Sequence, residues 1–314
     1  MRRTGNKSLI LTGATSGLGS ALAQLLSVSG SYRLILLCRN ERRRAELIGR
    51  FGTDDVHYVV CDLAVLESVR EAAAELNNAV HAGDLGPIGS VVLNAGIHPG
   101  RRPGSAYGGL DSTMVTNLIA PHLLLALLSP SLAAEARVVF VGSGAHGRRR
   151  WWTGLPEPSG LPLAQACLPG ALGGPQAYVT SKRGTVELCR AYSERVPDDY
   201  AVLSYDPGIM PATGITRNMN GLSRWLFRSI LTRFENSEGF STPERSAAWL
   251  HEFLTRGDTA PGLAYAKIDR YLPWPTASST EAARALYHET NEIAGITAGL
   301  VAPWWFEAGH PPSD

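Results

Sequence analysis

Residues 8–19 read SLILTGATSGLG, an apolar run that ends in a turn containing three glycines. Leucines at helical spacing follow, at Leu22, Leu25 and Leu26. A strand, a glycine turn and a helix are typical of nucleotide binding, because glycine lets backbone N–H groups approach a pyrophosphate and the start of the helix adds partial positive charge. The alternative is an ordinary strand-to-helix turn, since the spacing Gly-x-x-x-Gly-x-Gly is not the commonest dinucleotide motif.

Five further apolar runs predict strands, at residues 34–38, 56–60, 88–93, 137–141 and 201–205. Helical patterns separate these runs, among them residues 113–128. Strands that alternate with helices predict a parallel sheet with helices on both faces. We therefore expect an α/β fold, a single doubly wound domain over residues 1–314, with its ligand beyond the carboxyl ends of the strands.

Motifs of polar residues and glycine stand at the predicted strand ends: Cys61-Asp62-Leu63, Asn94-Ala95-Gly96, Gly142-Ser143-Gly144 and Asp206-Pro207-Gly208. Asp62 could accept a hydrogen bond from an adenine amino group, or cap the helix that starts near Val65. The two roles are compatible. Because the carboxyl ends of parallel strands share one edge of the sheet, we expect all four motifs at one site.

The second predicted strand ends at Cys38, at a position where NAD-binding units commonly carry an acid that binds the ribose. Arg39 follows, and a guanidinium there suits the 2′-phosphate of NADP(H). The alternative is that the arginines form the solvated face of the next helix, which fits Arg43 and Arg44 better than Arg39. We therefore predict NADP(H) as the cofactor.

Tyr178 and Lys182 are four residues apart at the start of a predicted helix, so both side chains project from one helix face. A free phenol has a pKa of about 10, which an adjacent ammonium draws down towards working pH. The pair is a candidate acid/base unit. A surface helix with an extended lysine is the alternative, because this spacing is common by chance.

Composition limits the other possibilities. The chain has 314 residues, a net charge of +1 and four cysteines without a Cys-x-x-Cys motif, which suits a reducing cytosol and gives no case for nucleic acid. The histidines show no paired metal-ligand spacing. The apolar run at residues 9–11 is too short for a signal peptide, and residues 118–128 are too short to span a bilayer. We expect a cytoplasmic protein with no metal and no integral membrane contact.

Together, the motifs resemble the short-chain dehydrogenase/reductase family. They occur in the family's order over about residues 8–215: Thr12-Gly13-x-x-x-Gly17-x-Gly19, Asp62, Asn94-Ala95-Gly96, Asn117, Ser143, Tyr178-x-x-x-Lys182 and Pro207-Gly208. The resemblance implies a catalytic tetrad of Asn117, Ser143, Tyr178 and Lys182. Ser143 would bind the substrate oxygen, Tyr178 would transfer the proton, Lys182 would lower the tyrosine pKa and bind the nicotinamide ribose, and Asn117 would hold a water.

Cofactor contacts are expected from the motif residues and their neighbours: Gly13, Thr15, Ser16, Gly17, Leu18, Gly19, Arg39, Asn40, Asp62, Leu63, Asn94, Ala95, Gly96, Tyr178, Lys182, Pro207, Gly208 and Thr213. Within the family, residues 206–217 look closest to the branch that contains light-dependent protochlorophyllide reductases and retinol dehydrogenases. The photoreductases carry a cysteine directly after the Pro-Gly, and this chain has Ile209. Pigment photoreduction is therefore not expected, and ordinary carbonyl chemistry is.

Two segments are peculiar to this chain. Residues 144–177 form a long insertion rich in Pro, Gly and Leu that carries Arg148-Arg149-Arg150-Trp151-Trp152. It could be a substrate wall, a cover over a would-be dimer face, or a nucleic-acid patch, which the net charge does not support. In relatives with a similar insertion it packs over the dimer-forming helix, so we expect a monomer, with a homodimer as the alternative.

Residues 209–240 take the place of the family's substrate lid, and a basic amphipathic helix is predicted over residues 217–234. Packing on the core and peripheral membrane contact are its alternatives. Residues 261–314 form a C-terminal extension. The candidate substrate-pocket residues are Ala145, Trp151, Trp152, Ile209, Met210 and Trp225.

The sequence predicts an NADP(H)-dependent oxidoreductase that interconverts a carbonyl and an alcohol on a bulky, fairly apolar small molecule. One alternative is an NADPH-dependent reductase of carbon–carbon double bonds. Another is a non-catalytic NADP(H)-binding sensor or scaffold, against which the intact tetrad argues.

Overall fold

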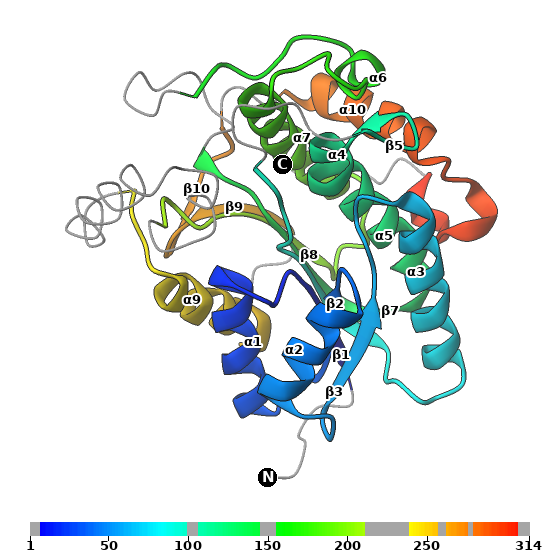
Figure 1. Ribbon diagram of the computed structural model, residues 1–314, viewed down its shortest axis with the longest axis vertical. Helices are drawn as coiled ribbons and strands as arrows, with labels where there is room; N and C mark the ends of the chain where they lie inside the picture. The colour runs from blue at the N-terminus through cyan, green and yellow to red at the C-terminus, as the bar shows by residue number, and fades with distance from the viewer. Residues whose placement is uncertain are drawn as a thin grey trace.

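An eight-stranded sheet forms the centre of the computed structural model, which describes residues 7–98, 106–144, 155–210, 239–256, 262–275 and 279–306 (Figure 1). The strand order is β10-β9-β8-β7-β4-β1-β2-β3. The parallel strands are β1 (Ser8–Thr12), β2 (Arg33–Cys38), β3 (Val56–Val60), β4 (Ile88–Leu93), β7 (Leu132–Val141), β8 (Ala201–Asp206) and β9 (Gly262–Lys267). Strand β10 (Arg270–Leu272) pairs antiparallel at one edge. The predicted α/β fold with a mostly parallel sheet is confirmed.

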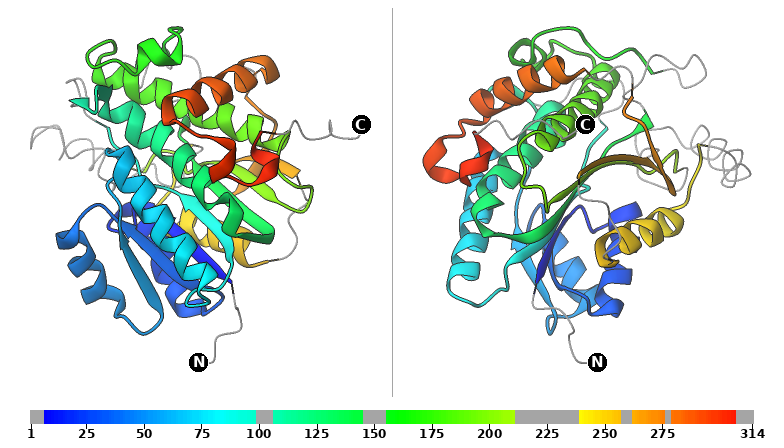
Figure 2. Two further views of the ribbon diagram at one scale, coloured as in Figure 1. Left: turned by 90° about the vertical axis from the view of Figure 1, so that its right-hand side faces the viewer. Right: turned by 180° about the vertical axis from the view of Figure 1, so that it is seen from behind.

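Helices cover both faces of the sheet (Figure 2). One face packs against α3 (Leu66–His81), α5 (Ala120–Leu128), α7 (Gly174–Ser193) and α10 (Thr280–Ala294). The other packs against α1 (Gly17–Ser29), α2 (Glu41–Phe51) and α9 (Pro243–Thr255). The side chains of a strand alternate between the two layers. In β1, for example, Ile10 packs in the α3/α5/α7 layer and Leu9 and Leu11 pack in the α1/α9 layer.

The helix predicted at residues 113–128 is built from three pieces: α4 (Ser112–Met114), a π-helical turn η1 (Val115–Ile119), and α5. A π turn is rare and is frequently found at functional sites, and this one carries Asn117. Among the described residues, Ser112–Ser131 is the helical stretch long and apolar enough to cross a membrane, and all of it is buried inside the protein. It is a core helix, although it is longer than residues 118–128, the run considered in the sequence analysis.

Strands β9 and β10 were not predicted from the sequence, and β7 starts at Leu132, ahead of the predicted start at residue 137. The extra strands extend the sheet beyond β8, where Ala201 pairs with Gly262 and Asp206 with Lys267. A small hairpin of β5 (Ala106–Tyr107) and β6 (Leu110–Asp111) precedes α4. The amphipathic helix predicted at residues 217–234 lies outside the described residues.

The C-terminal part packs over α7 and is held there by a buried polar cluster. Helix α10 lies along α7 and also contacts α5 and the short α6 (Leu163–Ala166). His122 Nδ1 is 2.7 Å from the hydroxyl of Tyr192, and its Nε2 is 2.9 Å from Asn291 Oδ1. The indole N–H of Trp305, in η7 (Pro303–Trp305), donates to the same Oδ1 at 2.9 Å. This cluster joins α5, α7, α10 and the end of the described chain. Two more short 3₁₀ turns among the described residues are η2 (Ser129–Ser131) and η6 (Ala298–Leu300).

Candidate active site

The glycine turn between β1 and α1 is packed so closely that side chains are excluded from it. A Cβ on Gly19 would lie 2.4 Å from both Asn94 Nδ2 and Gly13 O. Gly13 and Gly17 have positive φ angles of 74° and 56°, which L-residues rarely adopt. Within the described chain the first turn of α1 has neither an acidic residue nor a side-chain cap from Ser16. Its N–H groups can therefore bind an anion such as a pyrophosphate.

The loop after β4 is tied directly to this turn. Asn94 Nδ2 donates to the carbonyls of Thr12 at 3.0 Å and Gly13 at 3.2 Å. In return, Thr12 Oγ1 accepts the N–H groups of Asn94 and Ala95, both at 2.9 Å. These bonds fix two of the sequence-predicted motifs side by side at the carboxyl edge of the sheet. They form a rigid cradle that fits the diphosphate of a dinucleotide.

The expected adenosine end carries an ion pair. Arg39 Nε lies 3.5 Å from Asp62 Oδ2, and the Arg39 side chain is 71% exposed, so its guanidinium is accessible to a phosphate. Asp62 Oδ1 accepts the N–H of Ala64 at 3.0 Å, so this carboxylate stabilises the turn before α3 and is not the N-cap of that helix. Asn40 caps α2 by accepting the N–H of Arg43 at 3.1 Å. Leu63 is buried in the core.

Tyr178 and Lys182 lie on the first turns of α7, beside the end of β7. Lys182 is only 6% exposed, and its Nζ donates to the carbonyl of Val141 at 2.8 Å. The half-buried Tyr178 is hydrogen-bonded to the side chain of Ser143. Three members of the predicted tetrad therefore meet at the end of β7.

Asn117 reaches the same place from the π turn. Its Nδ2 donates to Ile97 O at 3.0 Å and to Ser181 Oγ at 3.1 Å, and its Oδ1 accepts the Ile97 N–H at 2.8 Å. A Cβ on Gly96 would lie 3.3 Å from Asn117 Oδ1 and 3.6 Å from Lys182 Nζ. Gly96 therefore separates the glycine cradle from the tetrad, in the path that an extended dinucleotide would follow.

Burial has the largest effect on the pKa values of Lys182 and Tyr178. It lowers the pKa of Lys182 to about 8, against the opposing effect of Asp206. It raises the pKa of Tyr178 above its usual value, and the hydrogen bond with Ser143 acts in the opposite direction. The sequence-based expectation was that Lys182 draws the tyrosine pKa down. In this structure desolvation of the phenol outweighs any such effect.

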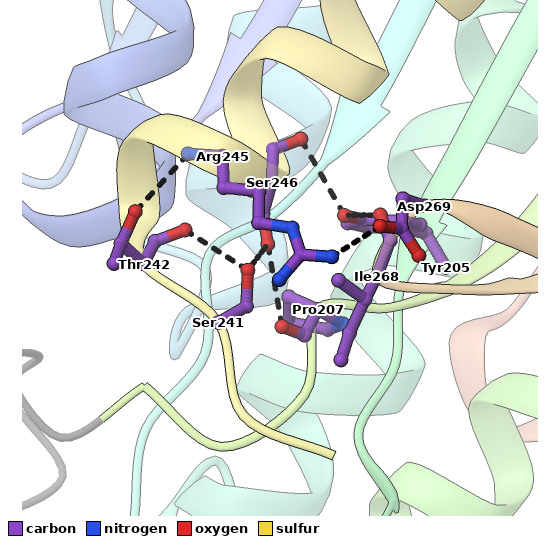
Figure 3. A network of polar contacts seen from close by, with 8 residues as sticks. All are labelled: Tyr205, Pro207, Ser241, Thr242, Arg245, Ser246, Ile268 and Asp269. Carbon is purple, nitrogen blue, oxygen red and sulfur yellow. Dashed lines mark hydrogen bonds and ion pairs between the residues drawn. The ribbon is translucent and has the colours of Figure 1, made fainter. Parts of the chain in front are cut away.

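The Pro207-Gly208 loop is held by a network of polar contacts (Figure 3). Gly208 has a φ of 76°, and a Cβ there would lie 2.9 Å from Gly239 O. Ser246 Oγ donates to the carbonyl of Pro207 at 3.3 Å, and the Tyr205 hydroxyl donates to Ile268 O at 2.7 Å. The network fixes this loop against α9 and β9.

The same loop is joined to the point where the described chain resumes at residue 239. Ile209 donates its N–H to Gly239 O at 2.9 Å and accepts the Ser241 N–H at 3.1 Å. The loop after β8 and the segment that starts at Gly239 therefore lie side by side. Of the predicted pocket residues, Ile209 and Met210 are described, and Met210 packs partly against the α1/α9 layer. Ala145, Trp151, Trp152, Trp225 and the predicted cofactor residue Thr213 lie outside the described residues.

The sequence analysis missed one residue of the site, His98, and gave no role to a second, Asp206. The ring of His98 lies 4.6 Å from that of Tyr178, centroid to centroid, at a tilt of 54°. Asp206 is 1% exposed, and its charge influences both Tyr178 and Lys182. Their positions carried a signal, because His98 follows the Asn94-Ala95-Gly96 motif and Asp206 directly precedes Pro207-Gly208.

Comparison with known proteins supports the family resemblance found in the sequence analysis. The short chain dehydrogenase family model matches residues 7–153. Protochlorophyllide reductase B of Hordeum vulgare is 26% identical over 324 residues, which cover 94% of this chain and 80% of that protein.

Solved structures show the same fold. A short-chain dehydrogenase/reductase (glucose/ribitol dehydrogenase) from Brucella melitensis superposes with a TM-score of 0.61 at 19% identity, over 84% of this chain and 96% of that one. A short chain dehydrogenase from Burkholderia cenocepacia J2315 in complex with NADP has a TM-score of 0.60 at 18% identity, over 85% and 98%. Over residues 7–153 the chain matches the short-chain dehydrogenase/reductase family, and it is an NAD(P)-dependent oxidoreductase of that type, which confirms the resemblance and the enzyme class.

Proposed function

We propose that this short-chain dehydrogenase/reductase uses NADP(H) to interconvert a carbonyl and an alcohol on a bulky, fairly apolar small molecule. The observation that carries the proposal is the convergence of Ser143, Tyr178 and Lys182 at the end of β7, with the serine and tyrosine side chains hydrogen-bonded to each other. Two adjacent hydroxyl groups beside a buried ammonium suit the oxygen of a carbonyl substrate.

The nicotinamide cofactor, when bound, supplies the hydride for reduction of the carbonyl carbon. Ser143 donates a hydrogen bond to the carbonyl oxygen and stabilises the negative charge that develops there. Tyr178 donates its hydroxyl proton to the same oxygen, and removes it in the reverse direction. The raised pKa of Tyr178 keeps the phenol protonated at neutral pH, which favours the reductive direction.

Lys182 and Asn117 orient this pair. The Lys182 ammonium donates to Val141 O at 2.8 Å, which fixes it beside Tyr178 and leaves its other two protons for the cofactor ribose and for a proton relay. Asn117 binds both backbone groups of Ile97 and also Ser181 Oγ, so it holds the loop after β4 against α7. Its place in the π turn puts it next to Lys182.

NADP(H) is preferred over NAD(H) because of the side chains after β2. Cys38 is buried and has no carboxylate to bind a free ribose hydroxyl, whereas Arg39 presents an accessible guanidinium. The ion pair with Asp62 orients this guanidinium without burying it. The NADP complex of the Burkholderia protein supports the same choice.

The proposed substrate is bulky and apolar because the groups expected around the reacting carbonyl are aromatic or aliphatic. The His98 ring packs against Tyr178 on one side, and Ile209 follows the Pro207-Gly208 loop. The sequences of the two segments beside the site add Trp151, Trp152 and Trp225. A ketone with a ring system or a long hydrocarbon part fits such a lining.

Reduction of a carbon–carbon double bond is the second candidate, favoured by the similarity to protochlorophyllide reductase B over most of the chain. This chemistry needs a proton donor for carbon as well as a hydride. Ile209 has no proton to donate to carbon. The site is therefore better suited to reduction of a carbonyl, for which Tyr178 is the proton donor.

The test is NADPH oxidation, measured beside NADH oxidation, with bulky ketones, quinones and enones. Tyr178→Phe should lower kcat at least about a hundredfold, because it removes the proton donor. Tyr271→Phe is the matched control, since Tyr271 lies at the sheet edge and is 53% exposed. The turnover of this variant should equal that of the wild type. Full activity of Tyr178→Phe would refute the proposed function.

A further inference from the structure

Asp206 is a buried carboxylate on the catalytic side of the sheet. It is the last residue of β8 and is 1% exposed. Strand side chains alternate, and Tyr205 packs in the α1/α9 layer, so Asp206 faces the opposite layer, which contains α7. Tyr178 and Lys182 come from α7. The strand and the helix therefore place the acid on the same side as the tetrad.

The two oxygens of Asp206 have different surroundings. Oδ1 accepts the N–H of Gly208 at 2.9 Å, which stabilises the Pro207-Gly208 turn. Oδ2 has no hydrogen-bond partner among the described residues. A Cβ on Gly144 would lie 3.1 Å from Oδ2, so this oxygen points at the backbone directly after Ser143. The turn uses only Oδ1. It therefore does not explain why Oδ2 is buried or why Oδ2 points at Gly144.

Lys182 is a buried cation on this side of the sheet, close to the end of β7. Its ammonium donates to Val141 O, and Val141 is the register partner of Tyr205, the residue before Asp206. A carbonyl supplies only partial negative charge, and a buried ammonium without a counter-charge loses its proton. Asp206 raises the pKa of Lys182, whereas burial lowers it.

Other charged groups lie around Asp206, but none of those in the described part of the chain takes its place. Lys267 on β9 is its register partner, yet it is partly exposed and makes no ion pair with Asp206 within the described residues. Asp269, beyond β9, is paired with Arg245.

From the other elements, His98 faces Tyr178, and burial lowers the pKa of its ring, which favours the neutral form. Tyr205, on the opposite sheet face, has its pKa raised by burial. Among the described residues, the carboxylate of Asp206 is therefore the negative charge that acts on Lys182.

We propose that Asp206 is a positioning residue of the active site, whose buried carboxylate keeps Lys182 protonated in the protein interior. Gly144 is part of this arrangement, because any side chain there would crowd Asp206 Oδ2. The proposal rests on the proposed function, since the charge on Lys182 matters for the chemistry of that site.

The chain offers a direct test, because it contains only three lysines, Lys7, Lys182 and Lys267. Protein labelled with ¹³C at lysine Cε gives three signals, and Lys7→Arg and Lys267→Arg assign two of them, so Lys182 is identified without mutating it. Each signal is followed by NMR from pH 6 to 11 in the wild type, in Asp206→Asn and in Asp269→Asn. Asp269→Asn is the matched control, because it removes a carboxylate at the same end of the sheet that is already paired with Arg245.

We expect the titration midpoint of Lys182 in Asp206→Asn to fall by about one pH unit or more, as for loss of an opposite charge nearby. The midpoint in Asp269→Asn should match the wild type. An unchanged or higher midpoint in Asp206→Asn would overturn the proposal. Should that variant not fold, as judged by circular dichroism, Asp206→Ser is titrated in its place.

Activity gives the second readout. The alkaline limb of kcat against pH for NADPH-dependent reduction should move to lower pH in Asp206→Asn by the same amount as the midpoint of Lys182. The titration itself needs no substrate. A shifted midpoint in a protein that reduces no carbonyl would therefore count against the proposed function and not against Asp206, and an active enzyme with an unshifted midpoint would count against Asp206 alone.

Discussion

Burial governs single residues at this site, because it moves the pKa values of the lysine and the tyrosine in opposite directions. The pKa of Lys182 is lowered to about 8, and the pKa of Tyr178 is raised. At neutral pH the lysine remains charged and the tyrosine remains protonated, which is the combination that reduction of a carbonyl requires. Above the lysine pKa this combination is lost.

The first prediction concerns the pH dependence of NADPH binding. Lys182 is protonated below its pKa of about 8 and neutral above it, so affinity for NADPH should be constant near pH 7 and should fall as the pH rises through 8. Calorimetric titration between pH 7 and 9.5 measures this. In Lys182→Met the affinity should be low and independent of pH over the same range. Constant affinity of the wild type up to pH 9.5 would contradict the assigned role of Lys182.

The second prediction concerns cofactor choice. Arg39→Gln should raise the KM for NADPH roughly 10- to 100-fold, as for loss of a charge-assisted contact, and leave the KM for NADH unchanged. Arg44→Gln is the control, because Arg44 pairs with Glu41 on α2 and should not affect either cofactor. Equal losses with both cofactors would mean that Arg39 supports the fold of the site and does not read the 2′-phosphate.

The positions of several candidate site residues could be predicted from the sequence because their motifs are local. The glycine turn, the Asn94-Ala95-Gly96 motif and the Tyr178–Lys182 spacing are of this kind. His98 and Asp206 could not be assigned in the same way. The ring contact of His98 with Tyr178 and the electrostatic effect of Asp206 on Tyr178 and Lys182 depend on how β4, β8 and α7 come together, and a single sequence does not show this.

At the level of elements, the docking of α10 depends on one fully buried histidine. Burial lowers the pKa of His122 to about 4, so its neutral ring bridges Tyr192 and Asn291 in the folded protein. In the unfolded chain the same ring is protonated below about 6.5. The folded pKa is the lower one, so this stabilisation is fully present above about pH 6.5 and is lost as the pH falls towards 4.

The third prediction concerns the loss of stability at acid pH that the lowered pKa of His122 causes. Between pH 7 and pH 4, His122 should account for a loss of about 3 kcal/mol in the free energy of unfolding, from a pKa difference of about 2.5 units. Urea unfolding at both pH values measures it. In His122→Gln, which keeps polar atoms but cannot be protonated, the loss should be smaller by that amount. An equal loss in both proteins would show that other groups cause the acid sensitivity.

The helix and strand pattern was well predicted where it is periodic, as in β1 to β4 and the helix at residues 113–128. The π turn η1 was not, because its five residues look helical in sequence. Strands β9 and β10 were also missed. They lie in an aromatic and proline-rich tail, and their pairing with β8 is a long-range contact.

At the level of the whole molecule, α10 covers part of the surface of α7 and also contacts α6 (Figure 2). The hydroxyl of Tyr287 on α10 donates to Trp305 O at 2.8 Å, and the Arg195 guanidinium lies 4.3 Å from the Tyr287 ring. An element anchored in this way occupies area that self-association through α7 would need. The C-terminal extension therefore covers part of α7, a role that the sequence analysis considered for the insertion at residues 144–177 and not for the extension.

The fourth prediction is that the protein is a monomer in solution. Light scattering coupled to size-exclusion chromatography should give a mass of 33.6 kDa, independent of concentration. A mass of twice that value across the concentration range would show a dimer built on another surface, and the covering of α7 would then have no bearing on assembly.

Carbonyl reduction is the central claim, and the fate of the hydride tests it most directly. NADPH carrying deuterium at its transferable position is oxidised with an α,β-unsaturated ketone that offers both sites of attack, and the product is analysed by NMR. Our account predicts deuterium on the carbon that bears the new hydroxyl group, with the double bond intact. Deuterium on the carbon β to a retained carbonyl would contradict it and would establish the enzyme as a double-bond reductase.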